Sequence, residues 1–465
     1  KKPEKGTLMS IDAQKIIESE KIVNPDNLFI VYLENYIDFL KVTIGEDETL
    51  FRNLENNIPD RIRTLKKLPD TSRYKNYLIG NINLQWATAH LKFGNYATGA
   101  LEINRSYRLL EQNQNEFPDF IPNSITLGIL HIMIGIVPDS YNWLLNLISM
   151  EGSVQQGQDE LITSYNICNN DTRYGFLTDE ILFYMGMINL NLNPDPKFAN
   201  FLIQKIELGI KNSLLLKYLA INTMMKNGMN NKALDLFSTI DTSANYYPFY
   251  YLKYLHGDCF IRILNTENAR EKYHSFLNNF KGYNYIKSAW QKIAWSYIIE
   301  GDTNAYTKAM KNVLKFGDEE IDADKSAQDN ANSEIIPNVE LLKSRLLFDG
   351  GYYKKSRTIL VNINTNNLSI KENVKRNYRL GRIAHGLNNI DEAKKHYDIT
   401  IETGSDFPEY MAANSALKMG NIYEIEHDSS KSEYYYKLCL ELDFDEYRNS
   451  IRAKAKQGLM RVSEK

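Results

Sequence analysis

Apolar side chains recur at helical spacing along most of the chain, and the pattern is clearest between Trp290 and Val313. The first segment carries apolar residues from Trp290 to Tyr297, a Gly-Asp pair follows at 301–302, and a second apolar stripe begins at Tyr306. Residues three and four positions apart share one face of a helix, and Gly commonly follows the end of one. The stretch therefore predicts two helices joined by a tight turn, which form a helical hairpin.

In the C-terminal half, the second helix of each predicted hairpin carries one residue, which we call the opener, and a bulky residue four positions later. Five of the six openers are small, and successive openers lie 36–39 residues apart except for one step of 50. A hairpin that recurs at such a period is typical of a solenoid, in which each unit buries its apolar face against its neighbours. The six pairs are Ala233 with Phe237, Ala269 with Tyr273, Tyr306 with Met310, Ser356 with Leu360, Ala393 with Tyr397, and Ser432 with Tyr436.

The order of residues in these hairpins resembles the tetratricopeptide repeat. That repeat has Trp, Leu-Gly and Tyr on its first helix and Ala-x3-Phe on its second, in a unit of about 34 residues. Trp290, Gly381 and Gly420 stand at such first-helix places in this chain. The resemblance implies an all-α fold, a right-handed α-solenoid of tetratricopeptide-like helical hairpins, over residues 181–465.

Residues 26–180 are predicted to form N-terminal helical repeats that include a long apolar hairpin at 124–168. This hairpin contains Gly128, Pro138, Leu144, Leu145, Gly152 and Gly157. At these residues it resembles a stretch of the tetratricopeptide repeat protein 39 family, which includes the yeast inclusion body clearance protein and has bacterial relatives. The resemblance implies a distant relationship and a helical-repeat adaptor without catalysis.

Three segments are expected to lie outside the repeats. Residues 1–25 are mostly polar and are interpreted as a leader or linker. Residues 317–333 are acidic, polar and aperiodic, so we expect an exposed loop inserted into the array. Residues 451–462 are basic and amphipathic, which suits a C-terminal capping helix.

Composition limits the kinds of partner. The chain has 465 residues, 43% of them hydrophobic, and a net charge of −3. Without a broad positive field, general nucleic-acid binding is not expected. The longest apolar run, 125–137, is shorter than the 20 or so residues that cross a bilayer, so no membrane span is expected.

The sequence offers no set of residues that predicts an enzyme, a cofactor or a metal site. Phosphate-binding loops, dinucleotide fingerprints, zinc-protease pairs and nucleophile elbows do not occur in it. The three cysteines are far apart, and the seven histidines have no ligand spacing. Asp322 and Asp324 open a stretch like a calcium loop, but Ala327 and Ser333 stand where Gly and Glu are required.

The first hypothesis for function is a scaffold or adaptor that binds a protein or peptide in the concave groove, which the first helices of such repeats line. Arginine mixed with aromatic residues suits an extended peptide or its carboxylates. The oligomeric state and the identity of the partner are not predicted. The candidate groove residues, expected to lie outside the core, are Tyr254, Asp258, Arg262, Gln291, Trp295, Arg345, Tyr378, Arg382 and His385.

Two alternatives are open at this point. One is an extracytoplasmic ligand- or glycan-binding accessory protein with a site near the 124–168 hairpin. The other is docking of that hairpin on a membrane surface, against which the adjacent charges Asp139 and Glu151 argue. A polar start without an initiator Met favours a periplasmic or outer-membrane-associated location after leader removal over a cytoplasmic one.

Overall fold

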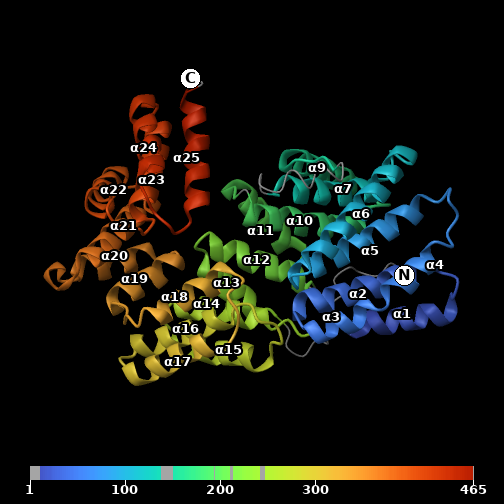
Figure 1. Ribbon diagram of the computed structural model, residues 1–465, viewed down its shortest axis with the longest axis horizontal. Coiled ribbons are helices and arrows are strands. Elements are labelled where there is room, and N and C mark those ends of the chain that lie inside the picture. The colour runs from blue at the N-terminus through green and yellow to red at the C-terminus, as the bar shows by residue number, and fades with distance from the viewer. Residues whose placement is uncertain (1–10, 138–149, 193, 210–212, 241–246, 464–465) are drawn as a thin grey trace. The chain divides into compact units, whose positions relative to one another are not determined.

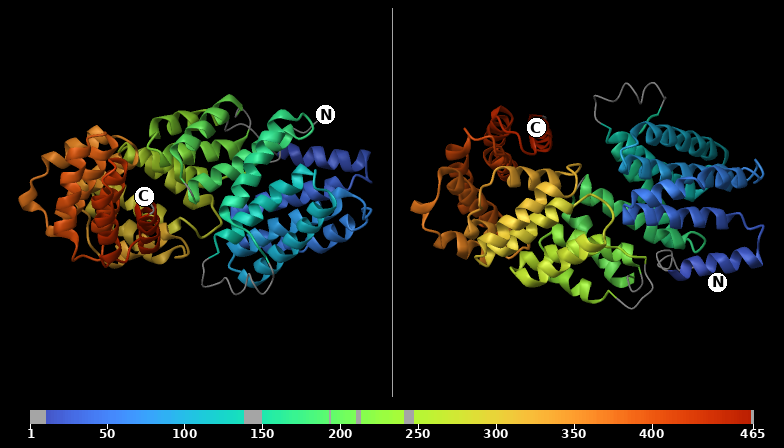
Figure 2. Two further views of the ribbon diagram at one scale, coloured as in Figure 1. Left: turned by 90° about the horizontal axis from the view of Figure 1, so that it is seen from above. Right: turned by 60° about the horizontal axis from the view of Figure 1, so that its bottom comes forward.

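The computed structural model describes residues 11–137, 150–192, 194–209, 213–240 and 247–463. All regular structure in these ranges is helical, and successive helices pack as antiparallel hairpins (Figure 1; Figure 2). The predicted all-α solenoid of helical hairpins is confirmed. None of the described helices is both long enough and apolar enough to cross a membrane.

The chain divides into two compact units, which we describe separately. Unit 1 comprises residues 1–227, 231–256 and 271–286. Unit 2 comprises residues 228–230, 257–270 and 287–465. Helices α13 (Asn230–Ser238), α14 (Tyr251–Arg262), α15 (Thr266–Asn279) and α16 (Ile286–Ile299) contribute residues to both units.

The remaining helices belong to one unit each. Those of unit 1 are α1 (Ile11–Val23), α2 (Phe29–Gly45), α3 (Glu48–Glu55), α4 (Ile58–Leu65), α5 (Arg73–Lys92), α6 (Tyr96–Glu116), α7 (Ile121–Gly135), α9 (Val154–Asn170), the 3-10 turn η3 (Gly175–Leu177), α10 (Thr178–Asn191), α11 (Pro196–Gly209) and α12 (Leu214–Lys226). Those of unit 2 are α17 (Thr303–Lys315), α18 (Asp322–Asn332), α19 (Val339–Asp349), α20 (Tyr353–Asn362), the 3-10 turn η4 (Thr365–Asn367), α21 (Ile370–Gly386), α22 (Ile390–Gly404), α23 (Met411–Ile425), α24 (Ser429–Glu441) and α25 (Arg448–Ser463).

The opener and its bulky partner are buried in all six pairs that the sequence predicts. The last hairpin shows how closely its helices approach. The Ser432 hydroxyl donates a hydrogen bond to the Gly420 carbonyl, with 2.9 Å between the oxygens. A Cβ on Gly420 would lie only 2.6 Å from the Tyr436 ring. A small opener and a facing glycine thus make room for the aromatic ring that fills the hairpin.

A hydrogen bond from a serine hydroxyl to a carbonyl of the paired helix also occurs in other hairpins. The Ser356 hydroxyl donates to the Ser344 carbonyl at 2.8 Å between α19 and α20. In unit 1, the Ser106 hydroxyl donates to the Gly80 carbonyl at 2.7 Å between α5 and α6. A buried hydroxyl needs a hydrogen-bond acceptor, and a carbonyl of the paired helix is within reach only when the two backbones lie close. Close helix pairing is therefore common to both units.

The apolar hairpin of unit 1 is formed by α7 and α9, which cross at two glycines. A Cβ on Gly128 would lie 3.1 Å from the Gly157 carbonyl oxygen, and a Cβ on Gly157 would collide with the α7 backbone. Gly152 also lies against this helix, at His131. Pro138, Leu144 and Leu145, the other residues of the family resemblance, lie outside the described residues.

The segment 317–333, predicted to be an exposed loop, contains helix α18. Its Asp324 is fully buried, and the carboxylate accepts a hydrogen bond from the Ser288 backbone N–H at 2.8 Å. Ser288 lies in the first turn of α16, so Asp324 caps that helix from outside. The prediction was wrong because only two buried alanines, Ala327 and Ala331, make up the apolar face of α18.

The polar start of the chain is also more ordered than predicted. Residues 11–23 form α1, and its Ala13 and Ile17 are buried in a cluster with Ile30 and Ile37 of α2. The described part of the expected leader or linker is therefore a helix packed on its neighbour.

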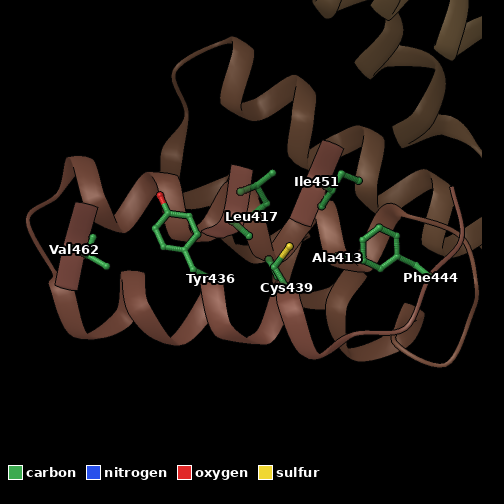
Figure 3. Close-up of a cluster of buried hydrophobic side chains, with 9 residues drawn as sticks. Ala413, Leu417, Tyr436, Cys439, Phe444, Ile451 and Val462 are labelled. Atoms are coloured by element: carbon green, nitrogen blue, oxygen red, sulfur yellow. The ribbon is translucent and has the colours of Figure 1, made fainter. Parts of the chain in front are cut away.

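At the C-terminal end of unit 2, α25 packs along α23 and α24. Ile451 and Val462 of α25 lie in one apolar cluster with Leu417 and Tyr436 (Figure 3). The Arg461 guanidinium donates to both carboxylate oxygens of Glu424, each at 2.8 Å. The apolar surface of the last hairpin is thereby covered by a helix whose outer face is polar.

Ala393→Arg tests the helix pairing in unit 2. Ala393 is fully buried, so the change both overfills the hairpin and buries a charge without a partner. We expect a loss of about 3 kcal/mol or more in the free energy of unfolding, measured by denaturant titration. Thr403→Arg, at an exposed position of the same helix, is the control and should change stability little. Equal stability of the two variants would contradict the register.

Asp324→Ala tests the cap that α18 provides. Losing the acceptor of the Ser288 N–H should lower the free energy of unfolding by about 1–2 kcal/mol, measured by denaturant titration. Asp324→Asn keeps a side-chain oxygen and should lose less. Asp322→Ala removes an exposed carboxylate from the same helix and serves as the control. If the two alanine variants unfold alike, Asp324 does not stabilise α16.

Candidate functional site

The structure separates the candidate groove residues into core and surface positions. Position along each first helix is counted back from the opener of the same hairpin. Position −15 holds Tyr254, Gln291 and Tyr378, which are 3%, 4% and 1% exposed. The prediction that these three lie outside the core was therefore wrong.

Contacts of the residues at position −15 agree with their burial. Tyr254 lies in unit 1 among other aromatic rings, with its centroid 5.5 Å from that of Phe276. The Tyr378 hydroxyl accepts a hydrogen bond from Asn414 at 2.7 Å. The Gln291 side-chain nitrogen has no acceptor among the described residues. These side chains hold neighbouring helices together.

Positions −14 and −11 hold charged residues in several first helices of unit 2. An α-helix turns by about 100° per residue, so position −14 points well away from the core-facing position −15, and position −11 lies between the two directions. Of the predicted residues, Asp258, Trp295, Arg345 and Arg382 occupy position −11. Their environments differ: Asp258 is 8% exposed, whereas the Arg345 side chain is 51% exposed.

The Asp258 carboxylate forms an ion pair with Lys292, at position −14 of the next first helix. The ammonium nitrogen lies 2.6 Å from a carboxylate oxygen, and both side chains are largely shielded from water. Burial lowers the pKa of Lys292, the charge of Asp258 opposes this effect, and Arg262 and Arg345 add to the lowering. Arg262, another predicted residue, therefore lies near this pair.

Arg345 combines a cation–π contact with a weak ion pair. Its guanidinium carbon lies 5.3 Å from the centroid of the Trp295 ring. Asp349, one turn further along α19, is 3.8 Å from the Arg345 guanidinium and 3.7 Å from that of Arg379. The structure thus brings together Trp295 and Arg345, two of the predicted residues.

Two guanidinium groups of α21 lie over Phe348. The Arg382 carbon is 4.5 Å from the ring centroid and the Arg379 carbon is 5.1 Å from it. Arg382 also lies 5.8 Å from the Tyr378 ring. Burial lowers the pKa of Arg379, and Asp349 opposes that effect. Arg382 has no carboxylate oxygen within 4 Å among the described residues.

Lys418 extends this row of cations to α23. Burial lowers its pKa, and the nearby charges of Arg382 and Lys454 lower it further. No carboxylate of the described chain lies within 4 Å of its ammonium group. Burial also lowers the pKa of the predicted residue His385, and the charges of Lys418 and Arg382 lower it further. The His385 Nδ1 lies 3.3 Å from the Tyr397 hydroxyl oxygen.

We call Lys292, Arg345, Arg379, Arg382 and Lys418 the cationic face of unit 2. Prediction from the sequence found two of its five members and missed Lys292, Arg379 and Lys418. A signal for the missed residues was present, because all three stand at position −14. Reading both positions across successive hairpins would have found the whole row.

The region of the alternative site, residues 124–168, contains a buried histidine paired with a glutamate. His131 is 6% exposed, and its Nδ1 lies 2.7 Å from the Glu160 carboxylate. A surface cavity of about 340 Å³ does occur in unit 1, but its lining comes from α1, α2 and α4 with the preceding Asn57. In the described ranges, no three His, Cys, Asp or Glu side chains are grouped as a metal site would require.

Comparison with known proteins finds similarity to solved structures only. The sequence matches no family model and no curated protein. A monomeric mutant of IFIT1 with Gppp-AAAA is 12% identical, with 99% of this chain and 96% of that chain covered and a TM-score of 0.35. The APC/C hetero-tetramer Cut9–Hcn1 is 12% identical, with 99% and 95% covered and a TM-score of 0.30. Yeast Tom70 is 12% identical, with 99% and 97% covered and a TM-score of 0.27.

TM-scores of 0.27 to 0.35 support no inference about function. The packing of the described helices carries the structural conclusion. The chain has a tetratricopeptide-like helical-repeat solenoid fold.

Proposed function

We propose that the chain is a non-catalytic helical-repeat scaffold that binds a peptide or protein segment along the first-helix face of unit 2. The observation that carries the proposal is a row of side chains at position −14 or −11 of four successive first helices, α16, α19, α21 and α23. The row consists of Lys292, Trp295, Arg345, Arg379, Arg382 and Lys418, so an extended segment can contact one helix after another. Repeat proteins use such surfaces to bind other proteins.

The chemistry of the row supports binding. Arg345 is half exposed and makes a cation–π contact with Trp295, so a rigid aromatic group and a charged group lie together. Tryptophan and arginine are the residue types most often found to carry interface energy. A guanidinium group stays protonated in proteins and is poorly suited to transfer protons.

Trp295→Ala is the direct test of this proposal. The full-length wild-type chain is first used to capture partners from the native organism, and a captured protein is identified and purified. Its affinity for the variant should be weaker by about 1–3 kcal/mol, or roughly 5- to 150-fold in Kd, measured by calorimetry.

Tyr434→Ala is the matched control, since Tyr434 is 59% exposed on the second helix α24. The control should bind the partner as the wild type does. If Trp295→Ala folds normally and also binds with unchanged affinity, the first-helix face is not the binding surface.

A further inference from the structure

The cationic face is a local concentration of positive charge in a chain whose overall net charge is −3. Among the ion pairs of the described residues, Asp258 pairs with Lys292, and Asp349 is shared by Arg345 and Arg379. The excess is greatest at its α21–α23 end. There the charge of Arg382 contributes to the lowered pKa of Lys418, and neither side chain forms an ion pair within 4 Å among the described residues.

Holding two like charges in a partly shielded site costs free energy. Lysine and arginine are seldom buried without a partner, because desolvation penalises the charged form. Burial and the neighbouring cations both lower the pKa of Lys418, so its charged form is disfavoured in the free chain. An anion bound beside Arg382 and Lys418 would offset this penalty.

The surroundings of the guanidinium groups favour carboxylates as that anion. The guanidinium carbon of Arg382 lies 4.5 Å from the ring centroid of Phe348 and 5.8 Å from that of Tyr378, and the carbon of Arg345 lies 5.3 Å from that of Trp295. A cation–π contact uses none of the guanidinium N–H groups as a hydrogen-bond donor to an acceptor oxygen. Those groups match the two oxygens of a carboxylate in a bidentate pair.

Contacts of the same rings argue against a nucleic acid. Proteins that bind single-stranded nucleic acid hold its bases mainly by stacking them on the faces of aromatic side chains. Here an arginine guanidinium already contacts each of the rings of Trp295, Phe348 and Tyr378, at 5.3, 4.5 and 5.8 Å from the ring centroid, and would compete with a base for that face.

We propose that the segment bound by unit 2 is acidic, and that Arg382 and Lys418 together bind one of its carboxylates while Arg345 binds another. This inference rests on the proposed function and specifies the chemistry of the partner. The carboxylates could come from Asp and Glu side chains or from a chain terminus, and the two sources share the same recognition.

The test uses the full chain and defined labelled probes. The first probe is a dodecapeptide of alternating Glu and Ser with an amidated C-terminus, and the second has Gln in place of Glu. A third is the Gln peptide with a free C-terminal carboxylate, and a fourth is a single-stranded RNA of equal charge. Fluorescence anisotropy should show binding of the Glu peptide that weakens as salt is raised. The amidated Gln peptide should bind at least about 10-fold more weakly.

Variants then locate the binding. Arg382→Gln and Lys418→Gln should each weaken the Glu peptide by about 10-fold or more. Lys437→Gln removes one positive charge from the outer helix α24, where the side chain is 55% exposed, and should change affinity less than twofold. Two separate variants keep the test valid if one of them fails to fold.

Each outcome bears on the inference. Binding of the free-carboxylate Gln peptide as tight as that of the Glu peptide would assign the Arg382–Lys418 site to a chain terminus and overturn the second carboxylate, at Arg345. Equal binding of both amidated peptides, tighter binding of the RNA, or no loss in either variant would overturn the inference. Binding of the amidated Gln peptide that depends on Trp295 would overturn the acidic preference alone and leave the proposed function standing.

Lys418→Met gives a readout without any ligand. Methionine keeps the length of the side chain and removes the charge that its surroundings disfavour, so the free chain should gain about 1–3 °C in Tm, measured by calorimetry. A lower Tm than that of the wild type would contradict the claim that the unpaired charge is a cost in the free chain.

Discussion

Close pairing of two helices at a small residue is the constraint on which this structure depends. Three serines on second helices, Ser106, Ser356 and Ser432, each donate a hydrogen bond from the hydroxyl to a backbone carbonyl of the paired first helix. A bulky residue four positions later then fills the space beside the contact. Because one hairpin cannot bury both of its faces, the next hairpin must dock against it, and a repeating array results.

The same pairing determines which side chains remain for function. Once the openers face inward, position −15 of the first helix is also directed to the core. The cations at positions −14 and −11 are shielded to different degrees, from 15% exposed at Lys292 and Arg379 to 51% exposed at Arg345. Those two positions carry lysine and arginine in several consecutive hairpins of unit 2. The cationic face is therefore a consequence of the repeat: one register buries the aromatic rings and aligns the charges beside them.

Prediction from the sequence was most reliable where the repeat is most regular. All six opener pairs were found because a small residue and a bulky one at fixed spacing report directly on helix pairing. The helix α18 was missed because Ala327 and Ala331 are weakly apolar and because the role of Asp324 depends on a distant backbone N–H. The predicted set of groove residues mixed surface residues with core residues. Tyr254, Gln291 and Tyr378 were misplaced, since helical periodicity alone cannot show which side of a first helix the neighbouring hairpin will cover.

A crystal structure of the full chain bound to the alternating Glu-Ser peptide tests the central claim most directly. The account predicts an extended peptide on the first-helix face of unit 2, with one carboxylate within hydrogen-bond distance of both Arg382 and Lys418. A peptide bound to the second helices, or on the first helices with its carboxylates turned away from these two cations, would contradict it.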